Sequence, residues 1–112
     1  MPFISANDVQ PQVVKAGDKT TIQALISLQE GPDFAMQRFV MKPGDGIPNH
    51  TNTVEHEQYM LRGHARIGIG GQEYEVKAGD VVFIPEGVPH WYQNDGEENF
   101  EFLCMIPISR MR

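Results

Sequence analysis

The chain has 112 residues, a formal net charge of −6 and a pI near 5.0. This length suits one domain with its own hydrophobic core, and the acidic balance argues against nucleic acid or an anionic membrane surface as a partner. The single cysteine, Cys104, excludes an internal disulfide, and without a basic, apolar leader or a long apolar run we expect a cytoplasmic protein.

The first residues differ from the rest of the chain. Residues 1–12 show no periodic pattern, but Phe3 and Ile4 are apolar in an otherwise polar terminus. Such a segment is either a frayed end or an arm that covers a partner subunit. We expect a homodimer to which this N-terminal arm contributes, because symmetric pairing covers the exposed sheet edges of a small β-domain.

The remainder of the chain is typical of short β-strands separated by glycine- and proline-rich turns. Alternating apolar and β-branched residues predict strands over residues 20–27, 34–41, 57–61, 65–69, 72–76, 81–84, 90–93 and 100–106. Gly70-Gly71 predicts a two-residue hairpin turn. Because no helical period, internal repeat or linker interrupts this pattern, we expect a single all-β domain over residues 1–112, either a sandwich or a barrel.

Two glycine-bounded segments contain the residues that suggest metal chemistry. In the first, His50 and Asn52 stand two positions apart, so an extended chain would point both side chains the same way. His56 follows a short, turn-prone gap that could bend the chain back toward them, and His90 lies in the second segment. Imidazole nitrogens and amide oxygens are both transition-metal ligands. We therefore predict a metal site where the two segments fold against each other.

These segments resemble the two sequence motifs of the cupin family. The first motif is matched at Gly44, His50 and Gly63, with Asn52 in place of its second histidine and His56 in place of its glutamate. The second motif is met in full by Gly79, Pro85, Gly87, His90 and Asn94. The resemblance covers residues 36–106 and implies a double-stranded β-helix, the jelly-roll barrel of cupins. The chain looks most similar to small single-domain bacterial and archaeal cupins with four metal-binding histidines.

The resemblance implies one divalent transition metal per chain, with His50, His56 and His90 as ligands. Asn52 is either a fourth ligand or a hydrogen-bond partner of metal-bound water. Mn(II) is favoured by the resemblance, Fe(II) comes next, and Zn(II) and Ni(II) are also compatible with imidazole ligands. Three neutral imidazoles leave the charge of the ion uncompensated, so we expect a small-molecule substrate that presents an anionic group.

Strand alternation predicts which other residues surround the site. Gln58 and Met60 share the face of His56, whereas Glu55 and Glu57 turn away from it. Phe102 and Cys104 share one face of the last strand, and His64 is expected to be exposed. Further candidates for the pocket, each with core, interface or solvent-facing placement as the alternative, are Arg38, Trp91 and Tyr92.

Three functions remain open at this point. The leading hypothesis is an oxygenase that binds substrate and dioxygen at adjacent open positions of the metal. The second is a non-redox isomerase, decarboxylase or cyclase that uses the metal as a Lewis acid. The third is a non-catalytic protein that binds a metal or a metabolite, since no residue is an unmistakable general base. Oxygen consumption separates the first two hypotheses, and the fold alone does not choose among them.

Overall fold

The computed structural model describes residues 4–14, 19–27 and 33–108. In this part of the chain a short 3-10 helix, η1 (Ala6–Asp8), precedes the strands. The strands are β1 (Gln12–Val13), β2 (Thr20–Ile26), β3 (Phe34–Met41), β4 (Gly46–His50), β5 (His56–Arg62), β6 (His64–Ile69), β7 (Gln72–Lys77), β8 (Val81–Ile84), β9 (His90–Gln93) and β10 (Phe100–Pro107). No helix among the described residues is long and apolar enough to span a membrane.

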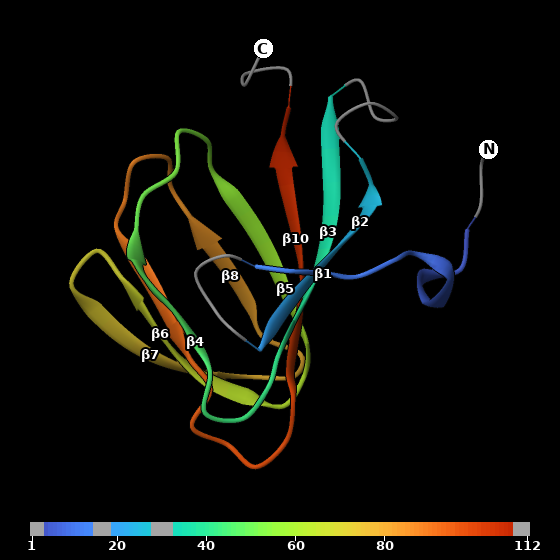
Figure 1. Ribbon diagram of the computed structural model, residues 1–112. Coiled ribbons are helices and arrows are strands. Elements are labelled where there is room, and N and C mark those ends of the chain that lie inside the picture. Colours follow the sequence, from blue (N-terminus) through green and yellow to red (C-terminus); the bar gives the residue numbers. More distant parts are fainter. Residues whose placement is uncertain (1–3, 15–18, 28–32, 109–112) are drawn as a thin grey trace.

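The strands form two antiparallel sheets that face each other as a jelly-roll barrel (Figure 1). One sheet has the strand order β1-β2-β3-β10-β5-β8, and the other has the order β4-β9-β6-β7. The all-β prediction is confirmed. Gly70 and Gly71 both have positive φ angles, of 58° and 90°, in the tight turn that joins β6 to β7, as the hairpin prediction requires.

The core lies between the two sheets and follows the alternation of the strands. In β10, Phe102 and Cys104, which were expected to share a face, are both buried, as are Phe100 and Ile106 on the same face. They meet side chains from the opposite sheet and from neighbouring strands, including Met41, Met60, Ile67 and Ile84. This packing holds β4, β5 and β9, the strands that carry the histidines, at one end of the core.

Three structured segments near the first half of the chain were not predicted from the sequence: η1, β1 and β4. Gln23 fastens the segment around η1 to β2 by donating hydrogen bonds to the carbonyl oxygens of Ala6 and Val9, at 2.9 and 3.0 Å. Ile4 is 45% exposed, and Phe3, the other apolar residue of the predicted arm, lies outside the described residues.

Asn94 ties the turn after β9 to β3. Its fully buried amide nitrogen donates to the carbonyl oxygens of Met41 and Glu98, at 2.9 and 3.0 Å, and its amide oxygen accepts from the backbone N–H of Gly96 at 2.9 Å. Removing the amide would leave buried backbone groups without partners, which is costly.

We therefore expect Asn94→Ala to lower the free energy of unfolding by about 2–3 kcal/mol. Urea unfolding followed by circular dichroism measures this change. Asn49→Ala, at an exposed asparagine, is the matched control and should alter stability by less than about 0.5 kcal/mol. Equal stability of the two variants would show that the Asn94 hydrogen bonds contribute little.

Candidate functional site

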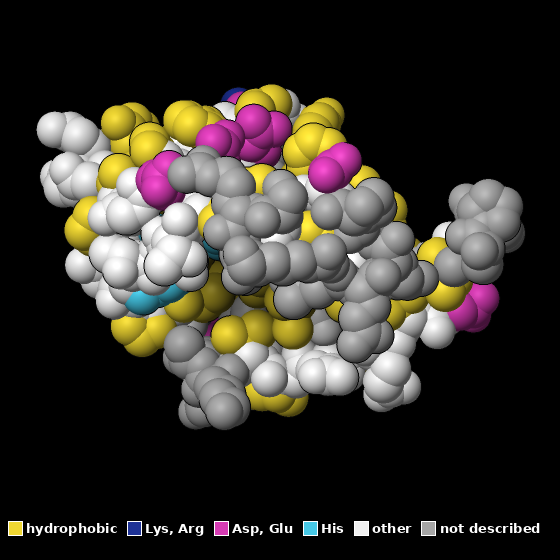
Figure 2. Space-filling view, turned by 90° about the horizontal axis from the view of Figure 1, so that it is seen from above, with side chains coloured by type: hydrophobic (Ala, Val, Ile, Leu, Met, Phe, Trp, Pro, Cys, Tyr) yellow, Lys and Arg dark blue, Asp and Glu magenta, His cyan; other side chains and the backbone are white. Residues whose placement is uncertain are grey.

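A cavity of about 610 Å³ opens between the two sheets at the end where β4, β5 and β9 meet. Figure 2 shows histidine side chains next to apolar ones at the edge of this hollow. The described residues that line it are Val14, Ile22, Gln37, Phe39, Ile47, Pro48, Asn49, His50, Asn52, Thr53, Val54, His56, Gln58, His90, Tyr92, Phe102 and Ile106.

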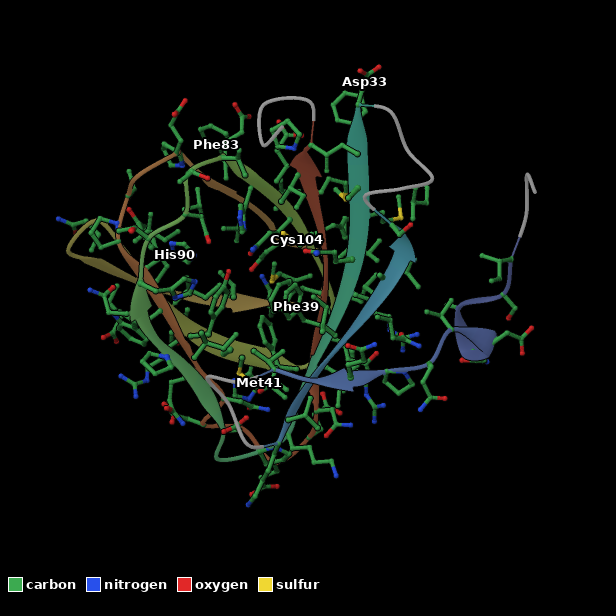
Figure 3. All side chains as sticks on the ribbon, turned by 45° about the horizontal axis from the view of Figure 1, so that its top comes forward. Asp33, Phe39, Met41, Phe83, His90 and Cys104 are labelled. Atoms are coloured by element: carbon green, nitrogen blue, oxygen red, sulfur yellow. The ribbon has the colours of Figure 1, made fainter. Side chains whose placement is uncertain are left out.

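Three strands bring three histidines together at this cavity. His50 ends β4, while His56 and His90 are the first residues of β5 and β9. The ring centroids of His50 and His90 lie 4.2 Å apart, and those of His56 and His90 lie 5.8 Å apart. In Figure 3 the side chain of His90 points into the space between the sheets, toward the side where Cys104 and Phe39 lie.

The Nδ1 atom of each ring already has a neighbour. Nδ1 of His50 lies 2.8 Å from the carbonyl oxygen of Pro48, and Nδ1 of His90 lies 3.0 Å from that of Val88. A carbonyl oxygen only accepts, so both rings donate from Nδ1, and in the neutral form of each ring the lone pair is then on Nε2. Nδ1 of His56 lies 3.4 Å from the Sγ atom of Cys104.

The surroundings favour the neutral form of the two more enclosed rings. Burial, followed by the proximity of His90 and His50, lowers the pKa of His56 to about 4. Burial also lowers the pKa of His90, although its hydrogen bond to the Val88 carbonyl acts in the opposite direction. Both imidazoles are therefore neutral at pH 7, which is the form that binds metals.

Asn52 lies beside the same donor atoms, in the loop after β4. Its backbone oxygen accepts a hydrogen bond from Gly87 at 2.8 Å, which fixes the loop against the segment before β9. Its Nδ2 atom lies 3.4 Å from Nε2 of His90. In this orientation the amide nitrogen faces the imidazole lone pair, whereas binding of a metal would require the amide oxygen at this position.

A buried polar group stands behind the histidines. Nε2 of Gln58 donates to the Tyr92 hydroxyl at 2.7 Å and lies 3.6 Å from Sγ of Cys104. Burial raises the pKa of the Cys104 thiol to about 11 and raises the pKa of Tyr92 as well, so both groups are protonated at neutral pH. The Oε1 atom of Gln58 is buried and has no hydrogen-bond partner among the residues that the structure describes.

The structure brings together most of the residues predicted for the site. His50, Asn52, His56, His90, Gln58 and Phe102 all line the cavity. Cys104 is completely buried and contacts the ring of His56 from behind. Met60 shares the inward face with Gln58 but is completely buried in the core and does not line the cavity. Glu57 and His64 are exposed, as predicted.

Arg38 and Trp91 are placed elsewhere, which corrects their prediction as pocket residues. Arg38 lies on the outer face of its sheet, where its guanidinium is 2.6 Å from the carboxylate of Glu101. Trp91 lies over Gly68, on the outer face of the other sheet, with the guanidinium of Arg66 5.6 Å from its ring centroid. In each case the adjacent residues of the strand point inward.

Sequence reasoning missed several walls of the cavity, notably Gln37 and Phe39 of β3 and Ile47 of β4. Strand alternation would have identified Gln37 and Phe39 as wall residues if Arg38 had been assigned from the sequence to the outer face of β3. Tyr92, considered as a wall but not preferred to Trp91, points inward because it lies two residues after His90.

The donor atoms are close but do not form a finished coordination sphere. Among the described residues, no three histidine, cysteine, aspartate or glutamate side chains are arranged to hold one ion together. His50 stands at the end of β4 and Asn52 in the loop after it, and both side chains are partly exposed.

Comparisons with known proteins agree with this architecture. A family model described as a cupin domain, Cupin_2, matches residues 37–106. The chain is 24% identical over 109 residues to (S)-ureidoglycine aminohydrolase of Arabidopsis thaliana, with 96% of this chain and 37% of that protein covered. It is 34% identical over 70 residues to an oxalate-binding protein of Thermotoga maritima, with coverage of 62% and 58%.

A third relative is gentisate 1,2-dioxygenase of a Ralstonia species, 22% identical over 121 residues, with 95% of this chain and 34% of that protein covered. The chain thus spans between 34% and 58% of the length of these three relatives. Among solved structures, the polyketide cyclase RemF from Streptomyces resistomycificus is 29% identical, with a TM-score of 0.88 over 96% of this chain and 80% of that one.

Proposed function

Because the chain belongs to the Cupin_2 family of cupin domains, we propose that it holds one divalent transition metal at His50, His56 and His90. In this proposal the protein acts on a small organic molecule bound in the cavity beside them. The observation that supports it most directly is the convergence of three histidines from three strands, two of them with a free Nε2 lone pair.

The residues present suit such an ion. Three imidazole nitrogens, with the Asn52 amide as a weaker fourth group, are compatible with Mn(II), which we favour, then with Fe(II), and also with Zn(II) or Ni(II). A bound ion would supply Lewis acidity and, where the metal is redox-active, open positions at which substrate and dioxygen meet.

The protein's own residues would bind and orient the substrate rather than transfer protons. No Asp, Glu, Lys or Arg is present among the described residues that line the cavity. The aliphatic and aromatic walls make the surroundings of the histidines less polar than water, which strengthens electrostatic interactions there. Gln58 holds the Tyr92 hydroxyl in place, and Cys104 supports the ring of His56.

An oxygenase is the reaction we propose first, because the cavity combines a histidine cluster that leaves open metal positions with mostly apolar walls, and because one relative is a dioxygenase. A non-redox reaction such as cyclisation is the second candidate, favoured by the similarity to a polyketide cyclase. A binding role without catalysis has support from the oxalate-binding relative.

Metal analysis and oxygen uptake test this proposal together. We expect purified protein to contain close to one divalent ion per chain, and we expect Mn(II)- or Fe(II)-loaded protein to consume oxygen with some member of a panel of phenols and carboxylic acids. Turnover by Zn(II)-loaded protein without oxygen uptake would favour the second candidate. Failure to bind any divalent metal would refute the proposal.

We also propose a homodimer. The outer face formed by β5 and β8, the edge strand of its sheet, exposes four large apolar side chains: Tyr59, Leu61, Val81 and Phe83, which are between 42% and 76% exposed. Pairing two such faces would remove this apolar surface from water.

We expect light scattering at micromolar concentration to give twice the mass of the chain, and we expect Phe83→Glu to shift the protein toward the monomer. A matched change at the opposite edge of the same sheet, Val13→Glu in β1, should leave the mass unaltered. A monomeric parent protein would contradict the proposal.

A further inference from the structure

The described walls of the cavity carry no formal charge other than any on the histidines. Their side chains are aliphatic, aromatic, hydroxyl-bearing or carboxamide groups. Proteins that bind dicarboxylates or phosphates usually set the planar, charged fork of arginine, or a lysine, against them. The volume of about 610 Å³ is also in the range of sites for ligands much larger than a two-carbon acid.

Three aromatic rings form one wall of this cavity. The ring of Phe102 stacks between those of Phe39 and Tyr92, with centroid distances of 4.9 and 5.2 Å and interplanar angles of 12° and 14°. Phe39 is the least buried of the three, so it is the ring most available to a ligand. A row of parallel rings favours a flat ligand that extends the stack or meets its edges.

Gln58 places a carboxamide in the cavity wall, and only one end of this group forms a hydrogen bond to the described part of the protein. Its side chain is 1% exposed and lines the cavity. The amide nitrogen donates to Tyr92, whereas the amide oxygen has no partner within the described part of the chain. A buried polar atom without a partner is rare and costly. A hydroxyl group both donates and accepts, so a ligand hydroxyl would satisfy the free end in either orientation of the amide.

The thiol of Cys104 lies between the same carboxamide and the ring of His56. Sγ of Cys104 lies 3.6 Å from Nε2 of Gln58 and 3.4 Å from Nδ1 of His56. A ligand that reaches Gln58 with one oxygen can therefore present a second oxygen to the histidine cluster.

From these contacts we infer the substrate class of the proposed metal site, an inference that rests on the proposed function. The substrate is a flat, hydroxylated aromatic molecule with at most one negative charge. Its ring lies against Phe39, one hydroxyl binds Gln58, and another oxygen faces the histidines. The described walls offer small dianions and sugar phosphates no cationic side chain, so we expect the protein to bind neither kind of anion in the absence of the metal.

Calorimetric titration of metal-free and Mn(II)-loaded protein with four compounds tests this inference. The compounds are 2-naphthol, 2-methoxynaphthalene, oxalate and mannose 1-phosphate. We expect both forms to bind 2-naphthol about tenfold more tightly than its methoxy analogue, since capping the hydroxyl removes one donor to a buried group. We expect the metal-free protein to bind neither anion measurably.

Variants identify the contacts. Gln58→Met should weaken 2-naphthol about tenfold and leave 2-methoxynaphthalene unchanged, whereas Phe39→Ala should weaken both compounds about tenfold. Gln72→Met, at an exposed glutamine of β7, is the matched control and should change neither affinity. The comparison of the two naphthalene compounds on the unmodified protein does not depend on whether a variant folds.

Three outcomes would overturn the inference: no binding of 2-naphthol at millimolar concentration, equal affinity for the two naphthalene compounds, or tighter binding of either anion by the metal-free protein. Because the hydroxyl preference is measured without metal, it is separable from the proposed function. A protein that prefers 2-naphthol but binds no divalent ion would refute the metal proposal and leave the ligand class standing.

Discussion

His90→Ala is expected to reduce metal affinity at least about 100-fold, more than an outer contact would. His90 is 1% exposed, it is the ring nearest to both other histidines, and its Nδ1 atom is held by the Val88 carbonyl so that Nε2 faces the cluster. Its loss removes a ligand that the surrounding structure already orients. The remaining two imidazoles and one amide would bind a divalent ion only weakly.

The measurement is metal content per chain after dialysis against a fixed concentration of free Mn(II). His64→Ala is the matched control, because His64 is exposed and does not line the cavity. His90→Gln fills more of the volume and tests whether a loss of metal reflects misfolding, which thermal unfolding also reports. Full occupancy in both His90 variants would refute the assignment of this residue as a ligand.

Most of the strands could be predicted from the sequence, because the pattern that indicates a strand lies in the residues of the strand itself and in the turns beside it. Alternating residues and glycine turns predicted the strands from β5 to β10 within one or two residues of their observed ends. β4 was not predicted as a strand because Gly46 and Pro48 within it are typical of loops, and its pairing with β9 depends on residues 40 or more positions away. β1 has only two residues, both exposed, and shows no pattern of its own.

The histidine cluster could be predicted because the spacing of the motif residues is visible in the sequence. The face of the other strands that points into the barrel could not be predicted in this way. Alternation divides a strand into two faces without saying which face is inside. In β3 every residue from Met36 to Val40 is partly buried, so the two faces of this part of the strand do not differ in burial. Arg38 points outward to meet Glu101, a partner from β10 that is 63 positions away.

The neutral character of the cavity is likewise a property of the assembled barrel. Its walls come from several strands and two loops, and some of these strands also carry charged residues on their outer faces, such as Glu57 of β5 and Glu101 of β10. Only the register of the two sheets shows that these carboxylates all lie outside. The histidines alone led us to expect an anionic substrate. The uncharged walls restrict this expectation to a substrate with at most one negative charge, placed at the histidine cluster.

Asn52 is the position at which the chain departs from the motif, and its variants should separate a ligand from a neighbour. The amide nitrogen of Asn52 lies 3.4 Å from Nε2 of His90. The side-chain amide would have to rotate so that its oxygen takes this place before it could bind an ion. An amide oxygen is a weaker ligand than an imidazole. We therefore expect Asn52→Ala to weaken metal binding by about 10–100-fold, less than His56→Ala does.

Asn52→His should have the opposite effect, because an imidazole at this place would complete a set of four. We expect it to bind metal more tightly than the parent protein and, if the protein is an enzyme, to lower turnover by filling a position that the substrate needs. Metal titrations of the Asn52 variants beside His56→Ala provide the comparison, with Asn7→Ala as the control at an exposed asparagine that does not line the cavity. If Asn52→Ala loses metal as completely as His56→Ala, Asn52 is a full ligand and the description of three firm ligands with one weak position is wrong.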